Sequence, residues 1–160
     1  MSRLNSILHG ATRLWCNVHR TQFVKATQSI EATQLVILKS ILKQTHDAPA
    51  HVQYDLKPNT NWKTFAKNVP ITDYKHWQPW IQHDAATLSN NLSQSPVERH
   101  QPTSGSTSAI KWIPYSRQFL AEVNNALMPW IGDLYQAHPG IRQGYHYWSV
   151  SWVPTSLRGD

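Results

Sequence analysis

One stretch of the chain reads Thr103-Ser104-Gly105-Ser106-Thr107-Ser108-Ala109-Ile110-Lys111-Trp112-Ile113-Pro114. In it, hydroxyl side chains lie on both sides of Gly105, and a lysine, Lys111, follows shortly after them. Gly105 lets the backbone adopt positive φ and approach a ligand closely, because glycine has no Cβ. Successive N–H groups in such a turn form a concave anion site, to which Ser and Thr hydroxyls add donors. Lys111 would bring a compact positive charge to the same anion. The stretch therefore predicts a phosphate-binding loop, and a Ser/Thr-rich surface turn between two strands is the simpler interpretation.

Two known loop motifs fit this stretch poorly. A Walker A loop needs a glycine directly before the lysine and a Ser or Thr directly after it, and Lys111 has neither. Ser108-Ala109-Ile110-Lys111 matches the S-x-x-K motif of penicillin-recognising enzymes, but no S-D-N or K-T-G motif follows. The loop is thus not explained by either motif.

Composition limits the classes of protein to consider. A chain of 160 residues that is 40% apolar, with eight Trp and six Tyr, is long and apolar enough for one globular domain. Fifteen basic against nine acidic side chains give a net charge of +6, which favours an anionic partner without specifying it. A single cysteine, Cys16, excludes an internal disulfide and fits a reducing compartment. We expect a cytoplasmic protein without a membrane span.

Three further features have simple interpretations. Residues 1–30 contain basic side chains and no acidic residue, which fits a transit peptide or, as the preferred interpretation, a solvated basic helix. The nine histidines show no ligand spacing, so no metal site is predicted. The aromatic residues recur at core spacing and no nucleic-acid-binding motif is present, so we expect no nucleic-acid partner.

The first half of the chain predicts helices. Apolar residues recur at helical spacing through Lys43, at Ile30, Val36, Ile37, Leu38, Ile41 and Leu42. Asn61 should cap a short helix that buries Trp62, Phe65 and Ala66. Thr72 should cap a further helix that carries Tyr74, Trp77, Trp80 and Ile81, with a kink or two short turns at Pro79.

The second half predicts a mixture of strands and one long helix. Ala85 to Pro102 is rich in Ser, Asn, Gln and Pro and indicates an irregular connection, followed by a short strand at 111–114. Ser116 should cap a long helix that bends at Pro129 and ends at His138-Pro139-Gly140. Residues 145–153 alternate as in a strand. The predicted class is α/β, with α+β as the alternative: helices, then a strand–phosphate loop–strand–helix–strand unit.

Several motifs together resemble one known family. Val69-Pro70-Ile71-Thr72-x-Tyr74, Trp77-Gln78-Pro79-Trp80-Ile81 and the loop followed by Lys111-x-Ile113-Pro114-Tyr115-Ser116 occur in its order and spacing. The family is the Gretchen Hagen family of acyl-acid amido synthetases, which includes the plant auxin- and jasmonate-conjugating enzymes. The resemblance covers about residues 21–153. It implies an adenylate-forming ligase, in which a carboxylic acid and ATP give an acyl-adenylate and an amino acid then displaces AMP.

The resemblance also implies site residues. Ser104, Gly105, Ser106 and Thr107 correspond to the nucleotide-phosphate loop of the family, and Lys111 to a catalytic lysine just beyond it. The helix after the loop lines the acyl-acid pocket in relatives, which places Val123, Asn124 and Leu127 near the substrate. The chain departs from the family at Ser108, where many relatives have a second glycine, and at Ile110, where bacterial relatives often have proline.

Length adds a further expectation. Members of this family are several times longer than 160 residues, and their adenine, ribose and metal-contacting motifs come later in the chain. We therefore expect a basic segment at 1–20 and the N-terminal part of a synthetase domain at 21–160. The implied cofactor is ATP with Mg²⁺, whose ligands would lie outside this chain. The implied partners are a carboxylic acid, an amino acid and a separate C-terminal part. The alternative is an inactive fragment or decayed gene product that retains only the first part of the fold.

Overall fold

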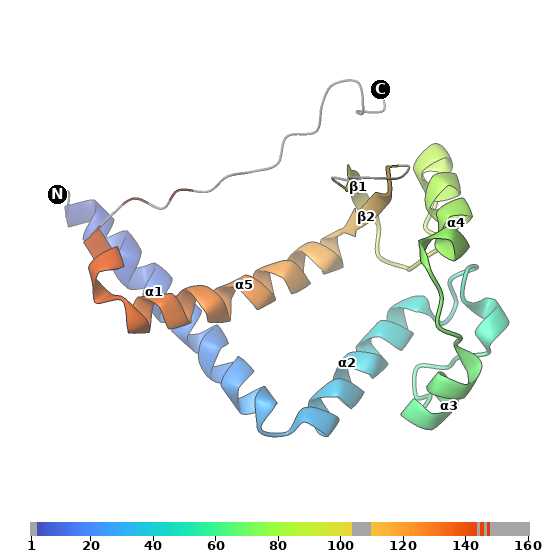
Figure 1. Ribbon diagram of the computed structural model, residues 1–160, viewed down its shortest axis with the longest axis horizontal. Helices are drawn as coiled ribbons and strands as arrows, with labels where there is room; N and C mark the ends of the chain where they lie inside the picture. Colours follow the sequence, from blue (N-terminus) through green and yellow to red (C-terminus); the bar gives the residue numbers. More distant parts are fainter. Residues whose placement is uncertain (1–2, 104–109, 144, 146, 148–160) are drawn as a thin grey trace. The chain divides into compact units, whose positions relative to one another are not determined.

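The computed structural model describes residues 3–103, 110–143, 145 and 147, which form helices and one pair of strands (Figure 1). The chain divides into two compact units. Of the described residues, the first unit comprises those at 3–30 and 120–147, and the second comprises those at 31–119. The elements are α1 (Arg3–Thr27), α2 (Ile30–Thr45), η1 (Val52–Tyr54), α3 (Trp62–Asn68), α4 (Tyr74–Thr87), β1 (Val97–Pro102), β2 (Trp112–Ser116), α5 (Arg117–Ala137) and η2 (Pro139–Gln143).

In the first unit, α1 crosses the C-terminal part of α5 (Figure 1). Cys16 of α1 is buried with Ile131 and Tyr135 of α5, and Met128 packs against this cluster. A Cβ built on Gly132 would lie 2.8 Å from the backbone oxygen of Cys16. The two helices can approach so closely because position 132 has no side chain.

Polar contacts also hold α1 to α5. His9 Nδ1 and the Tyr135 hydroxyl are 2.7 Å apart, and Arg20 Nε donates to Asp133 at 2.8 Å. The helix predicted at the basic N-terminus is confirmed as α1. The helix nevertheless keeps a row of exposed apolar side chains: Ile7, Leu8, Leu14, Trp15 and Val18.

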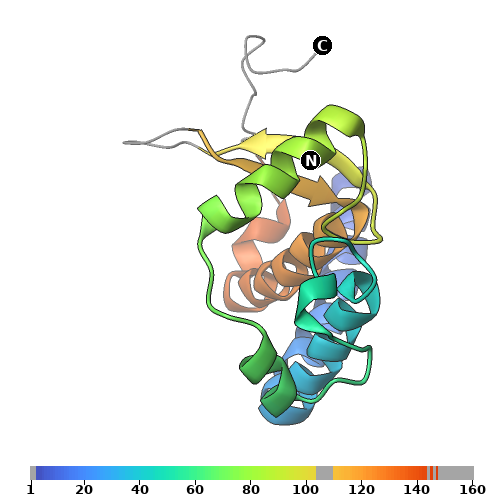
Figure 2. The same ribbon diagram turned by 90° about the vertical axis from the view of Figure 1, so that its right-hand side faces the viewer.

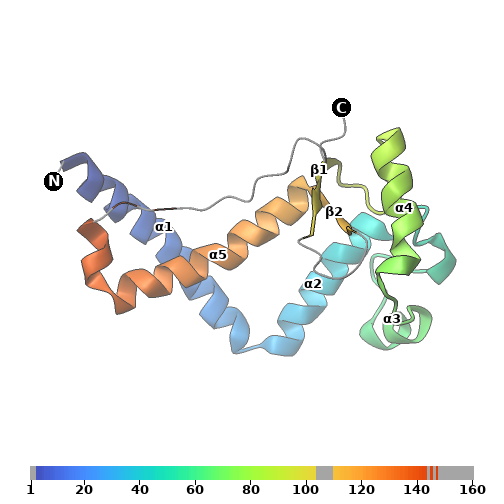
Figure 3. The ribbon, with the colours of Figure 1, turned by 45° about the horizontal axis from the view of Figure 1, so that its top comes forward.

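The core of the second unit forms where the C-terminal end of α2 meets η1, α3 and α4 (Figure 3). Leu42, Tyr54 and Leu56 are buried there, and four partly buried side chains pack around them: Leu38, Phe65, Val69 and Trp77. The helix predicted through Lys43 is confirmed as α2. Its predicted apolar face is buried only near its end, since Val36, Ile37 and Ile41 are exposed.

The two short helices before the strands begin at polar caps. Asn61 accepts a hydrogen bond from Thr64 N at 2.9 Å, as predicted, but Trp62 and Ala66 are exposed, so their predicted burial is wrong. The cap of α4 is Asp73 and not the predicted Thr72. The Thr72 hydroxyl instead accepts a hydrogen bond from the indole N–H of Trp77 at 2.8 Å. Thr and Asp both cap helices well. The Thr72 hydroxyl accepts the indole N–H of Trp77, and Asp73 caps the helix.

Pro79 does not divide α4. The helix runs from Tyr74 to Thr87 with the proline inside it, so the predicted pair of short turns is wrong, and the alternative, a kink at Pro79, stays a prediction. Proline removes one N–H donor from a helix, and α4 nevertheless continues beyond Pro79 to Thr87.

The strands form a two-stranded antiparallel sheet, beside which α4 lies (Figure 2). Val97 pairs with Ser116, His100 with Pro114 and Pro102 with Trp112, and the register shifts between Val97 and Arg99. The predicted irregular connection is therefore wrong for residues 97–102. These residues are mostly polar and lack strict alternation, so their pairing depends on a strand beyond the loop. The predicted strand–loop–strand order and the strand after the loop are confirmed.

The long helix begins as predicted. Ser116 Oγ accepts a hydrogen bond from Phe119 N at 3.1 Å, and α5 ends at Ala137, next to His138. Pro129 is buried inside α5. Most of the predicted strand at 145–153 lies outside the described residues, and Tyr145 and Tyr147 are exposed. The described residues thus combine helices with one small antiparallel sheet, which is consistent with the predicted mixture of helices and strands.

Candidate functional site

The loop singled out in the sequence joins β1 to β2. Thr103 N donates to Lys111 O at 2.9 Å, one step beyond the last strand pair, Pro102 and Trp112. The hairpin therefore brings the two ends of the loop together. Ser104, Gly105, Ser106 and Thr107 themselves lie outside the described residues, so their assignment to a phosphate site stays a prediction.

Tyr74 of α4 supports the second strand directly after the loop. Its hydroxyl accepts a hydrogen bond from Trp112 N at 2.9 Å and lies 3.4 Å from Trp112 O. The same ring lies under Lys111, whose Nζ is 5.7 Å from the ring centroid. A cation at this distance from an aromatic face is attracted by the electrons of the ring. One tyrosine thus positions both the strand and the lysine.

Lys111 is exposed, and it forms no ion pair with any residue that the structure describes. Its positive charge is therefore not neutralised by a neighbouring carboxylate. An ammonium group held at the base of a loop in this way can attract an anion that binds there.

Charged side chains further along the hairpin have partners of their own. Arg117 forms an ion pair with Glu98 at 2.8 Å, and Arg99 lies over the ring of Tyr115, 5.3 Å from its centroid. His100 Nε2 is buried, and it has no hydrogen-bond partner among the described residues. Burial lowers the pKa of His100, and the negative charge of Asp84 acts in the opposite direction. The neutral form of His100 is therefore favoured.

A buried carboxylate organises the turn that leads into β1. Asp84 is 2% exposed and accepts hydrogen bonds from Ser89 Oγ, Asn91 N and Nδ2, and Leu92 N. Leu88 ends α4 in the left-handed conformation with φ 54°, which turns the chain back toward this carboxylate. The network fixes the path of the chain ahead of the hairpin.

His51 and Ala50 attach the same turn to the preceding segment. His51 Nε2 lies 3.0 Å from Leu92 O, and Ala50 N donates to Asn91 O at 3.1 Å. Burial lowers the pKa of His51, while the hydrogen bond to the Leu92 carbonyl acts to raise it. Neither Asp84 nor His51 was assigned a role from the sequence. The polar run Ser89-Asn90-Asn91 after a helical aspartate was the available signal, but solvated turns have the same composition.

The residues predicted to line an acyl pocket lie on α5. Val123 and Asn124 are exposed and Leu127 is half-buried. They belong to the first unit, whereas Lys111 belongs to the second. Their proximity to a substrate stays a prediction.

The described residues contain neither a cluster of metal ligands nor a membrane-spanning helix. Within these residues, no group of three or more His, Cys, Asp and Glu side chains is arranged to hold a metal ion. No helix among them has the length and apolar character needed to cross a membrane.

The hairpin lies within a region that matches a known protein family. The model of the GH3 family N-terminal domain matches residues 19–157, which include α2 to α5 and the loop between the strands. The chain belongs to the GH3 family. This is the Gretchen Hagen family of acyl-acid amido synthetases that the motifs around residues 69–81 and 103–116 resemble, so the resemblance is confirmed. A comparison with curated proteins finds no match.

Proposed function

We propose that this chain is the N-terminal part of an ATP-dependent acyl-acid amido synthetase. The observation that supports the proposal most directly is the match to the GH3 family N-terminal domain across the hairpin and its loop. The geometry at the base of the loop agrees with a phosphate site. The ammonium group of Lys111, which forms no ion pair with a described residue, lies where the two strands separate.

The proposed reaction has two steps. A carboxylate oxygen of the acid attacks the α-phosphorus of ATP, and the bond to the bridging oxygen breaks to release pyrophosphate. The amino group of an amino acid then attacks the acyl carbon, loses a proton, and displaces AMP. The first step replaces a poor leaving group by a good one, which makes amide formation feasible at neutral pH.

The chain would contribute to the first step. Hydroxyls and backbone N–H groups of Ser104–Thr107 would bind phosphate oxygens, and Lys111 would stabilise charge that develops on the leaving pyrophosphate. Tyr74 would keep Lys111 at the base of the loop through its ring and Trp112 through its hydroxyl. Val123, Asn124 and Leu127 would contact an apolar acyl group.

The test is a pyrophosphate exchange assay. The 160-residue chain is mixed with the C-terminal part of a GH3 synthetase, and labelled pyrophosphate is followed into ATP with a panel of small aryl and alkyl acids. Exchange that depends on one of the acids, and diversion of the adenylate to an amide by an added amino acid, are the expected results. Either part alone serves as the control and should show no exchange.

A failure has a defined meaning. If the mixture is soluble and binds ATP but shows no exchange with any acid, the synthetase proposal fails. The chain would then be an inactive member of the family.

A further inference from the structure

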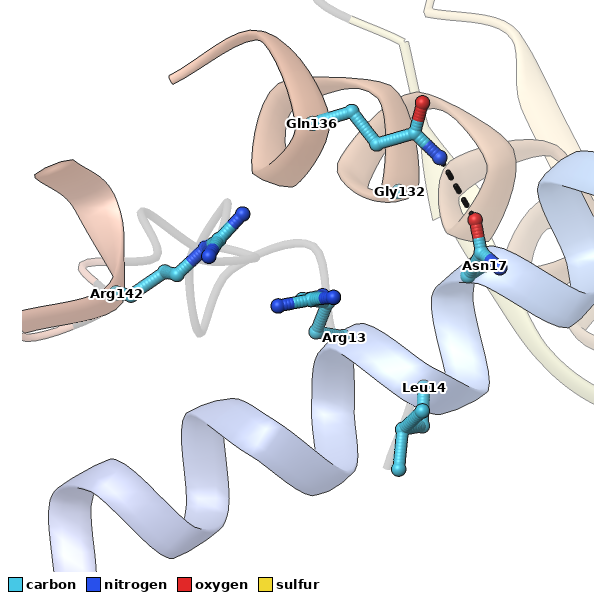
Figure 4. Close-up of a pocket in the computed structure, with 6 residues that line it drawn as sticks. All are labelled: Arg13, Leu14, Asn17, Gly132, Gln136 and Arg142. Atoms are coloured by element: carbon cyan, nitrogen blue, oxygen red, sulfur yellow. Dashed lines mark hydrogen bonds between the residues drawn. The ribbon is translucent and has the colours of Figure 1, made fainter. Parts of the chain in front are cut away.

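The first unit contains a pocket that the proposed reaction does not use. It has a volume of about 250 Å³ and lies where α1, α5 and η2 meet (Figure 4). Its lining side chains and glycine, all among the described residues, are Arg13, Leu14, Asn17, Gly132, Gln136 and Arg142. Four of these six residues carry guanidinium or amide groups, which are hydrogen-bond donors, so the pocket is rich in donors.

Arg142 has a donor without an acceptor. One of its terminal nitrogens, Nη2, donates to the backbone oxygen of Tyr135 at 3.1 Å, which fixes the side chain against α5. Its Nε is buried, and no described residue accepts a hydrogen bond from it. A buried N–H donor without an acceptor is unfavourable, so an acceptor that enters the pocket would relieve it.

Arg13 supplies a second positive charge. The guanidinium groups of Arg13 and Arg142 extend toward each other across the pocket (Figure 4). Neither arginine forms an ion pair within the described part of the chain, where the nearby Asp133 pairs with Arg20. The two positive charges repel each other, and an anion bound between them would attract both and offset this repulsion.

The amides at the side of the pocket are already oriented. Gln136 Nε2 donates to Asn17 Oδ1 at 2.7 Å, as the dashed line in Figure 4 shows. Because the oxygen of Asn17 accepts this bond, its NH₂ group remains able to donate to another acceptor. The pairing therefore fixes the two amides relative to each other at the side of the pocket.

We propose that Arg13 and Arg142 bind a small phosphate-type oxyanion in this pocket. Two planar guanidinium groups can each give paired hydrogen bonds to phosphate oxygens, and together they match the charge of a dianion. The volume of the pocket admits a phosphate group. The chemistry is shared by free phosphate and by phosphomonoesters. The site uses no residue of the hairpin, so its test does not depend on the proposed synthetase activity.

The test is calorimetric titration of the 160-residue chain with inorganic phosphate at constant ionic strength. One saturable site is expected. Arg13→Gln should raise Kd about tenfold, because it removes a charge-assisted contact and Arg13 has no structural hydrogen bond in the described chain. Arg142→Gln should weaken binding further, but it also removes the contact with Tyr135, so Arg13→Gln is the decisive variant.

Lys25→Gln is the matched control. It removes one positive charge from the same helix, and Lys25 is exposed and does not line the pocket. Its Kd for phosphate should equal that of the parent. A parallel titration with methyl phosphate distinguishes a site for phosphomonoesters, which bind as tightly as phosphate, from a site that accepts only the free ion. Acetate should bind at least tenfold more weakly than either.

Three outcomes would overturn the proposal. They are an unchanged Kd in Arg13→Gln, an equal loss in Lys25→Gln, which would indicate attraction by net charge alone, and the absence of saturable binding to the parent. Circular dichroism of each variant confirms that the helices are intact, so that a loss of binding is assigned to the pocket.

Discussion

Tyr74 and Trp112 are 38 positions apart in sequence, and the hydroxyl of the first accepts the backbone N–H of the second at 2.9 Å. This bond attaches α4 to the strand that leaves the loop. Tyr74→Phe should therefore destabilise the hairpin by about 1 kcal/mol, the usual net worth of one hydrogen bond. The exchange rate of the Trp112 amide hydrogen measures the effect. Tyr115→Phe is the control, and equal protection of Trp112 in parent and Tyr74→Phe would contradict the assignment.

Lys111 should act on the rate of adenylation more than on ATP affinity. In the reconstituted synthetase, Lys111→Ala should slow pyrophosphate exchange by roughly a hundredfold, because its charge is needed most when the leaving group develops charge. The dissociation constant for ATP should change much less. Lys67→Ala, which removes an exposed lysine of α3, is the matched control. A parental exchange rate in the Lys111→Ala enzyme would remove Lys111 from this role.

The Asp84 network should be among the most sensitive parts of the second unit. Asp84→Ala leaves partly buried N–H donors of Asn91 and Leu92 without their acceptor and should cost about 3 kcal/mol in the free energy of unfolding. Urea denaturation measures this loss. Asp47→Ala, which breaks the exposed pair with His46, should cost less than about 1 kcal/mol. Similar losses in the two variants would show that the network contributes little.

His51 should make the second unit less stable in acid. Its folded pKa is lowered, chiefly by burial, below its ordinary value of 6.5, so the unfolded chain binds more protons in this range. The stabilisation by neutral His51 is complete above pH 6.5 and is lost as the pH falls toward and through the folded pKa. His51→Gln should reduce the difference in unfolding free energy between pH 7.5 and pH 5.

The pKa of His100 is also lowered, so the His51→Gln protein should retain part of the pH dependence. Glutamine can still donate to the Leu92 carbonyl, and the substitution therefore removes the titration more than the contact. Parallel curves for parent and variant would show that His51 does not titrate differently in the two states.

Gly132 should resist substitution, while Gly10 should not. A Cβ at position 132 would lie 2.8 Å from the Cys16 backbone oxygen, so Gly132→Ala should force α1 and α5 apart and cost about 1–3 kcal/mol. A Cβ at position 10 meets nothing within 4 Å, and Gly10→Ala should stabilise α1 by about 0.5–1 kcal/mol. Thermal unfolding of the two variants should shift in opposite directions. If the unfolding temperatures of both variants shifted in the same direction, the close approach of α1 and α5 at Gly132 would be contradicted.

The helices were largely predictable because their signals are local. Ser116 and Asn61 cap α5 and α3 as their positions before apolar runs indicated. Burial was less predictable, since helical spacing does not tell which neighbour covers a face. Trp62 is 59% exposed although it was expected in a core. The cap of α4 differed by one residue because adjacent Thr72 and Asp73 are both good caps.

The candidate site was predictable only in its chemistry. The hydroxyl-rich stretch and Lys111 were recognised from residue types, but Tyr74 was recognised only as a residue of a predicted helix and of the motif at 69–74. Its contact with Trp112 depends on how α4 packs on β2, which local pattern does not encode. β1 was assigned to an irregular connection because its residues 98–101 are polar and its partner strand comes after the loop.

The position of Cys16 has a practical consequence for measuring motion. It is the one thiol in the chain, its exposed fraction is 0%, and burial raises its pKa, so it reacts slowly while α1 rests on α5. A thiol reagent can modify it only when the two helices separate. The rate of Cys16 labelling therefore measures how often α1 and α5 separate, and it requires no substitution and no attached fluorophore.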